Sequence, residues 1–271
     1  MDVYFLLTVL TLSVSVTDGL LRDISGYKDF ITIIHNFYRS YEKAADMKEI
    51  TWDPYLQKRA EQWSENCYWD HQREGHGENL AYFWTNGHAE MTTMEVILKS
   101  SQNWWKEVND WSWSRDCGQA CHYTQMIWGS TERIGCALSK CGNLRTDSGR
   151  NYNDADFFVC FYDPPGNFVG KYPYTLGESC SKCSTGEVCN KGLCSKPKSY
   201  HAQTTTIPTA YPTTTSSSIL DKIRIQKNQN GASATYVQQI NGESEHNRLT
   251  SSRTKPRQST FIRRVIYRWV I

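Results

Sequence analysis

Cysteine is absent from both ends of the sequence. All ten cysteines lie between Cys67 and Cys194. They include no paired CxxC…CxxC or CxxC…HxxxH spacing of the kind that binds structural zinc. An even number of cysteines gathered in one region therefore predicts disulfides formed in an oxidising compartment, rather than zinc sites in the cytosol.

The signatures of common hydrolases are absent as well. The sequence has no HExxH motif of a zinc peptidase and no Gly-x-Ser-x-Gly turn around a nucleophilic serine. The even cysteine count also leaves no thiol over as a nucleophile. Catalysis is therefore less expected than ligand binding, and a metal-dependent hydrolase is kept as an alternative.

No apolar run is long enough to cross a bilayer comfortably. The run from Val3 to Val16 is followed by small or polar residues, and it predicts a cleaved signal peptide over residues 1–19. Because Asp2 precedes this run without a Lys or Arg, an amino-terminal anchor or a core strand is the alternative. There is no Asn-x-Ser/Thr acceptor and no anchor signal at the carboxyl end. We expect a secreted, extracellular protein without a transmembrane span.

Acidic residues are absent after Glu245, where seven Lys or Arg residues occur. The formal net charge of the chain is +2, so the part up to Glu245 carries 2 − 7 = −5. The folded part should therefore lack the basic face that nucleic acid binding needs, and we expect no nucleic acid partner.

Three helices are predicted in the first half of the chain. Apolar residues spaced three and four apart predict a helix between Tyr27 and Met47. Asp53 followed by Pro54 predicts the start of a second, and a third is expected from Met91 to Val108. The lone His35 is interpreted as a packed residue rather than a ligand.

Two strands are predicted later, at Ile134–Leu138 and Asp156–Tyr162, and the second is apolar on both faces. Residues 71–78 hold two histidines, two glycines and two acids and predict a loop that presents polar groups. Four tryptophans from Trp104 to Trp113 are interpreted as core. The order of elements predicts an α/β fold, a three-layer α-β-α sandwich with one core.

The carboxyl end cannot build a core of its own. Residues 176–195 hold four cysteines among Gly, Ser and Lys, and predict a small hinge held by disulfides. From Thr204 to Ser218, ten of fifteen residues are Thr or Ser, which is typical of an extended O-glycosylated segment. Residues 196–271 are therefore expected to form a disordered linker and a basic tail.

Three motifs occur in a specific order. They are Gly77-Glu78-Asn79-Leu80-Ala81, then His122-Tyr123-Thr124-Gln125 with Trp128, then Phe158-Val159-Cys160-Phe161-Tyr162-Asp163-Pro164-Pro165-Gly166-Asn167. Together they resemble the signatures of the CAP family, which comprises cysteine-rich secretory, antigen 5 and pathogenesis-related proteins and includes venom-allergen-like proteins. The resemblance implies a CAP (SCP) domain over residues 25–175, followed by the hinge of the cysteine-rich secretory branch.

The resemblance also implies a metal-competent cleft, because CAP proteins line one with two histidines and two glutamates. Two neutral imidazoles can bind zinc or another divalent cation while carboxylates act as ligands or hold water. A metal-free cluster ordered by Glu–His hydrogen bonds is the alternative. Gln72 replaces a common Ser, and His76 is an extra imidazole. The four residues that match the family are His71, Glu78, Glu107 and His122.

The family pattern further implies five disulfides and no free thiol. The implied pairs are Cys67–Cys141, Cys136–Cys160, Cys180–Cys189, Cys183–Cys194 and Cys117–Cys121.

Three functions from different classes fit these residues. The first is a non-enzymatic binder of sterols or other lipids, to which the aromatic residues Trp63, Tyr68, Trp69 and Tyr82 would offer apolar surface. The second is a secreted effector that acts on a host or receptor partner, an unknown extracellular protein. The third is a metal-dependent hydrolase or protease. We favour the first, because no nucleophile–base arrangement is complete in the sequence.

Overall fold

The chain forms two compact units. The computed structural model describes residues 18–85, 89–197, 223–228 and 231–236. One unit extends to Tyr200 and the other begins at His201. In chain order the described elements are β1 (Gly19–Arg22), η1 (Ser25–Tyr27), α1 (Lys28–Arg39), β2 (Thr51–Trp52), α2 (Pro54–Ser64), β3 (Tyr68–Trp69), β4 (Gly77–Trp84), α3 (Thr93–Lys106), η2 (Glu107–Asp110), α4 (Cys121–Met126), β5 (Arg133–Thr146), β6 (Asn151–Asp163), β7 (Val188–Asn190), β8 (Leu193–Ser195), β9 (Ile223–Asn228) and β10 (Gly231–Tyr236).

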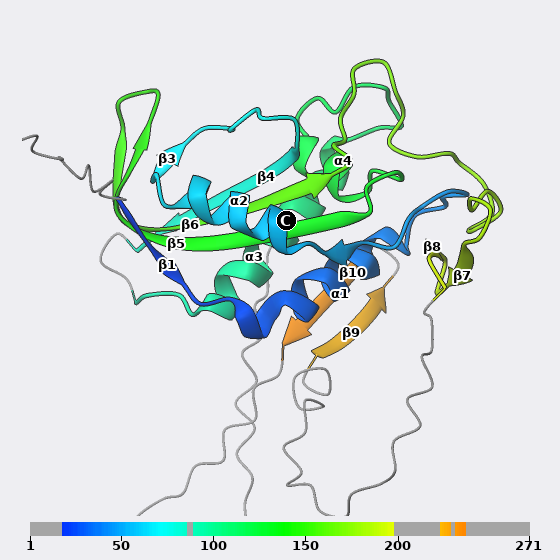
Figure 1. Cartoon of the computed structure of the whole chain (residues 1–271), viewed down its shortest axis with the longest axis horizontal. Helices are drawn as coiled ribbons and strands as arrows, with labels where there is room; N and C mark the ends of the chain where they lie inside the picture. The colour runs from blue at the N-terminus through cyan, green and yellow to red at the C-terminus, as the bar shows by residue number, and fades with distance from the viewer. Residues whose placement is uncertain (1–17, 86–88, 198–222, 229–230, 237–271) are drawn as a thin grey trace, which may run out of the picture. The chain divides into compact units, whose positions relative to one another are not determined.

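A six-stranded sheet is the centre of the first unit (Figure 1). Four strands lie in the order β1-β5-β6-β4 and are antiparallel to their neighbours. The two-residue strands β2 and β3 pair in parallel with β5. Strands β5 and β6 are longer than predicted, because their hairpin continues to the pair Arg145 and Asn151. Both of these residues are exposed, so the end of the hairpin is not marked by an apolar side chain in the sequence.

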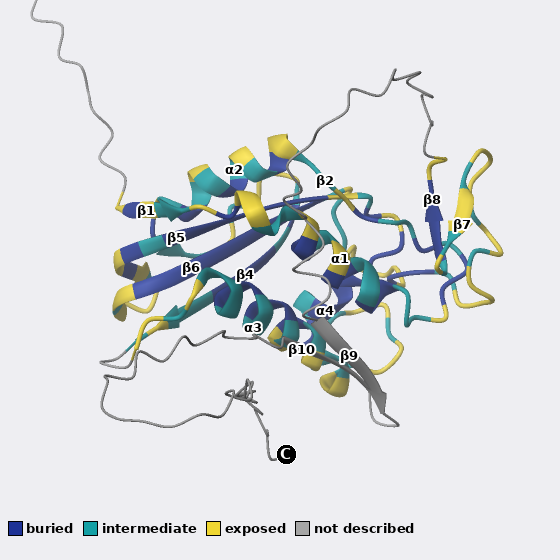
Figure 2. Ribbon diagram, turned by 90° about the horizontal axis from the view of Figure 1, so that it is seen from below, coloured by how far each residue is buried: buried dark blue, intermediate teal, exposed yellow. Residues whose placement is uncertain are grey.

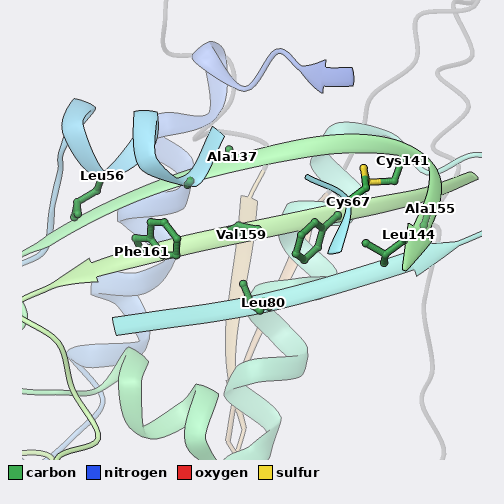
Figure 3. Packing of buried hydrophobic residues seen from close by; sticks show 11 residues of the cluster. Leu56, Cys67, Leu80, Ala137, Cys141, Leu144, Ala155, Val159 and Phe161 are labelled. Atoms are coloured by element: carbon green, nitrogen blue, oxygen red, sulfur yellow. A yellow bond between two sulfur atoms is a disulfide. The ribbon is translucent and has the colours of Figure 1, made fainter. Parts of the chain in front are cut away.

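Helices cover both faces of the sheet, as Figure 2 shows: α2 lies on one face, and α1, α3 and α4 lie on the other. This arrangement confirms the predicted three-layer α-β-α sandwich. Leu56 and Ala60 of α2 belong to the same buried cluster as Val159 and Phe161 of β6 (Figure 3). Burial of a side chain such as Leu56 contributes about 1.5–3 kcal/mol. A helix of eleven residues needs such packing because it is marginal alone in water.

Helix α2 begins where the sequence predicts. The Asp53 carboxylate accepts hydrogen bonds from the N–H groups of Tyr55 (2.8 Å) and Leu56 (3.2 Å), and Pro54 occupies the first helical position. Gly135 of β5 lies against this helix. A Cβ at that position would be 2.1 Å from the backbone nitrogen of Gln57, so only glycine lets the helix lie this close to the strand.

The other predicted helices are present with different ends. Helix α1 ends at Arg39, well before the predicted limit. Helix α3 starts after Thr92, whose side chain forms a capping box with Glu95, and it continues into the 3-10 turn η2. His35 of α1 is fully buried, as expected of a packed residue.

The segment predicted as a polar loop also contains the start of a strand. Gly77 begins β4, an edge strand that pairs with β6 along its whole length. Its opening residues are small or polar, so no alternation of apolar side chains marks them as a strand. Gly77 packs tightly there, because a Cβ would lie 2.2 Å from the side-chain oxygen of Gln125.

Disulfides join all ten cysteines in the same five pairs that the family resemblance implies. Two of the pairs cross-link the sheet and the chain beside it, one closes the loop before α4, and two hold the hinge. The pairs are Cys67–Cys141, Cys136–Cys160, Cys117–Cys121, Cys180–Cys189 and Cys183–Cys194.

The hinge is fastened to the segment that follows α1. The N–H of Cys194 donates to the carbonyl of Met47 at 2.7 Å, and the N–H of Glu49 donates to the carbonyl of Cys194 at 2.9 Å. The Lys48 ammonium lies 2.6 Å from the Glu187 carboxylate. These contacts make the hinge part of the first unit rather than an appended segment.

Most of the predicted signal peptide and tail lies outside the described residues. Gly19, inside the predicted signal range, is already part of β1, and Asp18 pairs with Arg145 at 2.8 Å. In the second unit, β9 and β10 form an antiparallel hairpin where no regular element was expected. The alternation of Ile223 and Ile225 with polar residues was the missed signal. No helix in the described ranges is both long and apolar enough to cross a membrane.

Candidate functional site

One histidine–glutamate pair is formed by the loop between β3 and β4. Nδ1 of His71 lies 3.1 Å from Oε2 of Glu78. The same carboxylate accepts hydrogen bonds from the N–H groups of Gln72 (2.8 Å) and Arg73 (2.6 Å). The side chain of Glu78 is 5% exposed, whereas that of His71 is 46% exposed. A buried carboxylate thus fixes the loop and holds an accessible imidazole.

A second pair joins the end of α3 to the start of α4. Nδ1 of His122 lies 2.7 Å from Oε1 of Glu107. Oε2 of Glu107 accepts the N–H groups of His122 (3.0 Å) and Tyr123 (3.2 Å). These N–H groups have no partner inside the short helix, so the carboxylate both caps α4 and orients the imidazole.

Strand β4 connects the two pairs. Glu78 belongs to the first pair, and its neighbour Asn79 donates from Nδ2 to the carbonyl of His122 at 3.0 Å. The Trp104 ring stacks beside the His122 ring, with 6.0 Å between their centroids. Asn79 therefore links the pair of Glu107 and His122 to the start of β4, where Glu78 pairs with His71.

The two carboxylates hydrogen-bond to the histidines and do not form a common ligand cluster with them. No three donor atoms of the four residues lie within 4.8 Å of one another; the described residues contain one such group, the sulfurs of Cys180, Cys183 and Cys194. These sulfurs are in disulfides and are not thiolate ligands. Each Glu carboxylate accepts from an Nδ1–H, which leaves the Nε2 lone pair of each His available to a ligand.

Three buried polar atoms around this site have no hydrogen-bond partner within the described protein: Oε1 of Gln72, Nδ1 of His76 and Oδ1 of Asn79. Gln72 and Asn79 flank the Glu78 pair in the structure. His76 stacks on Phe161, at 5.8 Å between centroids, and takes no part in either His–Glu pair. Unpartnered buried acceptors are costly, so a bound water or ligand group near Gln72 and Asn79 fits this site.

A separate aromatic hollow of about 460 Å³ lies beyond α4. Trp113 and Tyr172 stack at its side, with 4.9 Å between ring centroids, and Trp128 and Phe168 contact at 6.0 Å. Asp46 lies in the wall, where its carboxylate accepts from the backbone N–H and the hydroxyl of Thr175. The hollow is lined by Asp46, Trp113, Trp128, Gly129, Ser130, Phe168, Lys171, Tyr172, Pro173, Tyr174, Thr175 and Leu176.

Comparison with known proteins decides the family. The model of the cysteine-rich secretory protein family, CAP, matches residues 33–162. Peptidase inhibitor 15 of Xenopus laevis is 35% identical over 184 residues, which cover 61% of this chain and 70% of that protein. The chain belongs to the CAP family.

Other CAP proteins match over a similar share of the chain. Human cysteine-rich secretory protein LCCL domain-containing 2 is 34% identical over 186 residues, and the match covers 64% of this chain but 37% of that protein. A solved structure, the crystal structure of NaASP2 with Zn²⁺, is 29% identical with a TM-score of 0.53. It covers 63% of this chain and 95% of the NaASP2 chain. A CAP protein of this fold has therefore been crystallised with zinc.

The CAP motifs located the His–Glu residues, but they did not locate the hollow. Of the aromatic residues expected to offer apolar surface, Trp69 and Tyr82 pack against each other at 4.6 Å on the α2 side of the sheet. The hollow instead uses Asp46, Trp113, the stretch that begins with Trp128 of the second motif, and residues that follow the third motif. The interpretation of the tryptophan cluster as core holds for Trp104, which is 2% exposed, but Trp113 is 37% exposed.

Proposed function

We propose that this CAP protein is a secreted, non-enzymatic binder of sterols or other lipids that also holds a divalent cation at His71 and His122. The aromatic hollow carries the proposal. Its volume of about 460 Å³ lies in the range of small-molecule sites, which are apolar with a few placed polar groups. Five aromatic rings line it, and its one carboxylate is already hydrogen-bonded by Thr175.

The chemistry around the hollow favours binding over catalysis. Tyr174, which lines the hollow, donates its hydroxyl to the Glu42 carboxylate at 2.7 Å, and Tyr123 donates to the same carboxylate at 2.8 Å, so the Tyr174 hydroxyl is engaged in a fixed hydrogen bond. No nucleophile–base pair lines the hollow among the described residues. An apolar ligand would need only the rings and the shape of the wall.

The extracellular location is part of the same proposal. Five disulfides join all the cysteines, and such bonds persist in oxidising compartments. The apolar amino-terminal run provides the expected route of export.

Replacement of Trp113 tests the lipid site. We expect the full chain to take up radiolabelled cholesterol. Trp113→Ala should weaken uptake about tenfold, because an aromatic ring that a bound ligand covers contributes about 1.4 kcal/mol or more to binding. Trp84→Ala is the matched control: Trp84 is 46% exposed and packs with Tyr82 and Tyr152, outside the hollow. The Trp84→Ala variant should bind cholesterol like the wild type, and so should the double variant His71→Ala, His122→Ala.

Two results would overturn the lipid proposal. Weaker uptake by Trp84→Ala than by Trp113→Ala would move the site to the aromatic cluster at the end of β4. An absence of lipid uptake together with hydrolysis of peptides or esters, lost with chelator and with Glu78→Ala, would establish the enzyme alternative.

The cation site is tested by calorimetry with Zn²⁺. The two free Nε2 atoms are the donors, so the double variant His71→Ala, His122→Ala should lose measurable binding. Glu107→Gln should weaken binding by about 10–100-fold, since residues that orient a histidine ligand typically contribute this much. Metal binding competes with protons at imidazole, so wild-type affinity should fall in acid.

His76→Ala is the control for the zinc experiment, because His76 stacks on Phe161 and belongs to neither pair. It should bind zinc like the wild type. Equal affinity of the wild type and the double variant would contradict the assignment of these histidines.

A further inference from the structure

Half of the large apolar side chains that are exposed in the described part of the chain gather around the mouth of the hollow. The described residues hold ten such side chains, and five of them are Trp113, Phe168, Val169, Tyr172 and Leu176. We call these five residues the apolar rim. Val169 is 98% exposed, and it lies between Phe168 and the turn at Gly170. Such a concentration marks an interaction surface, because single exposed apolar residues are ordinarily scattered.

The loop before α4 and the segment after β6 are bonded to each other and hold the rim as a rigid platform. The N–H of Gly170 donates to the carbonyl of Arg115 at 3.2 Å, and the N–H of Lys171 donates to the carbonyl of Phe168 at 3.0 Å. The stacked rings of Trp113 and Tyr172 join the same two loops. In Figure 1 the yellow-green segment after β6 arches out beside the green loop before α4. The apolar tip is therefore presented outward without having to be ordered on binding.

Two cations lie on the rim and are free of carboxylates. The Arg115 guanidinium is 5.0 Å from the centroid of the Tyr172 ring, and the Lys171 ammonium is 5.1 Å from that of Phe168. Neither cation forms an ion pair within the described residues. The nearby acids are engaged elsewhere: Asp116 accepts the N–H of Gly118, and Asp46 is bonded by Thr175 inside the hollow. Arg115 and Lys171 are both exposed, and the exposed Asp116 beside Arg115 forms no ion pair with either of them within the described residues.

We propose that the apolar rim docks on the surface of a bilayer that carries anionic phospholipids. Apolar and aromatic side chains with flanking Arg and Lys are the combination that binds membrane interfaces, where aliphatic groups insert, Trp and Tyr occupy the headgroup level and cations contact phosphates. Val169 and Phe168 insert, Trp113 and Tyr172 lie among the headgroups, and Arg115 and Lys171 contact lipid phosphates. Docking needs only the rim, so it holds whether or not the hollow takes up a sterol.

Vesicle co-sedimentation with the full chain tests this docking. We expect binding to phosphatidylcholine vesicles that contain phosphatidylserine, and weaker binding to pure phosphatidylcholine. Val169→Asp should weaken binding to the phosphatidylserine vesicles at least tenfold. Val188→Asp, which changes a residue 49% exposed on the hinge, should leave this binding unchanged. Arg115→Gln and Lys171→Gln should each cost about fivefold, the usual contribution of one basic residue near an anionic surface.

The double variant Lys182→Gln, Lys191→Gln controls for total charge, because it removes two hinge lysines and leaves the rim intact. It should bind like the wild type, which also separates the rim from the basic residues after Glu245. Hydrogen exchange gives a local measurement: amides of residues 168–172 should become protected on vesicles, and those of residues 188–190 should not.

Two outcomes would overturn the proposal. One is an absence of vesicle binding, which would indicate that the rim binds a protein instead of a membrane. The other is binding that Val169→Asp weakens no more than Val188→Asp does, without protection of residues 168–172. Cholesterol uptake is measured in solution without vesicles, so either result leaves the proposed lipid-binding function to be judged separately.

Discussion

At the scale of single residues, Arg39 explains how the wall of the hollow is held. Its side chain is fully buried in α1, and its guanidinium donates to backbone carbonyls at distances of 2.7–3.3 Å. No carboxylate forms an ion pair with it among the described residues, so carbonyl dipoles compensate the charge together with the more distant Asp46 carboxylate. The carbonyls belong to Lys48, Met126, Trp128, Gly129 and Thr131. Arg39 therefore fixes the chain that follows α4, which forms one wall of the hollow.

His35, one turn earlier in α1, makes the stability of the protein depend on pH. Its Nδ1–H donates to the Ile31 carbonyl at 2.7 Å, and its Nε2 accepts the hydroxyl of Tyr162 at 3.0 Å. Burial lowers the pKa of His35 from 6.5 to about 4, and the charge of Arg39 acts in the same direction. The folded protein therefore keeps this imidazole neutral in mild acid.

The sign of the effect follows from the lowered pKa. Between pH 6.5 and about 4 the unfolded chain binds a proton at His35 that the folded chain does not. The free energy of unfolding should thus fall as pH falls through this window, by about 3 kcal/mol for this group. Denaturant unfolding of His35→Gln should show lower stability at neutral pH but a smaller loss between pH 6.5 and 4. Identical pH profiles of the two proteins would show that other groups cause the loss.

At the scale of elements, the sequence predicts what depends on local rules and misses what depends on packing. Helix α2 was predictable because Asp53 and Pro54 mark its start whatever lies around it. Strand β4 was not, because Gly77 and Glu78 form a strand only through pairing with Tyr162 and Phe161 of β6. A pattern of glycine and acid indicates a loop until the partner strand is known.

The two candidate sites divide in the same way. His71, Glu78, Glu107 and His122 were found from motif resemblance, yet spacing alone could not show that each carboxylate binds one Nδ1 and leaves Nε2 free. The hollow could not be found at all, because Trp113 and Tyr172 are far apart in sequence and meet only when the loops before α4 and after β6 lie together.

At the scale of the whole molecule, buried contacts and hydrogen bonds join the hinge to the domain. The predicted bounds divide them at residue 175. The contacts argue for a larger unit: Leu193 of the hinge belongs to the same buried cluster as Ala44 and Met47, and the N–H of Lys182 donates to the carbonyl of Ala45 at 2.9 Å. Removal of the hinge would expose this cluster.

Two fragments test where the stable unit ends. A fragment of residues 18–197 keeps every disulfide and both candidate sites, so it should unfold within about 2 °C of the full chain and take up cholesterol equally well. A fragment of residues 18–175 lacks the hinge, exposes Ala44 and Met47 and leaves the Ala45 and Met47 carbonyls without their hinge donors. A loss of about 3 kcal/mol should lower its unfolding temperature by about 10 °C. Thermal unfolding followed by circular dichroism makes the comparison, and equal unfolding temperatures for the two fragments would place the limit at residue 175.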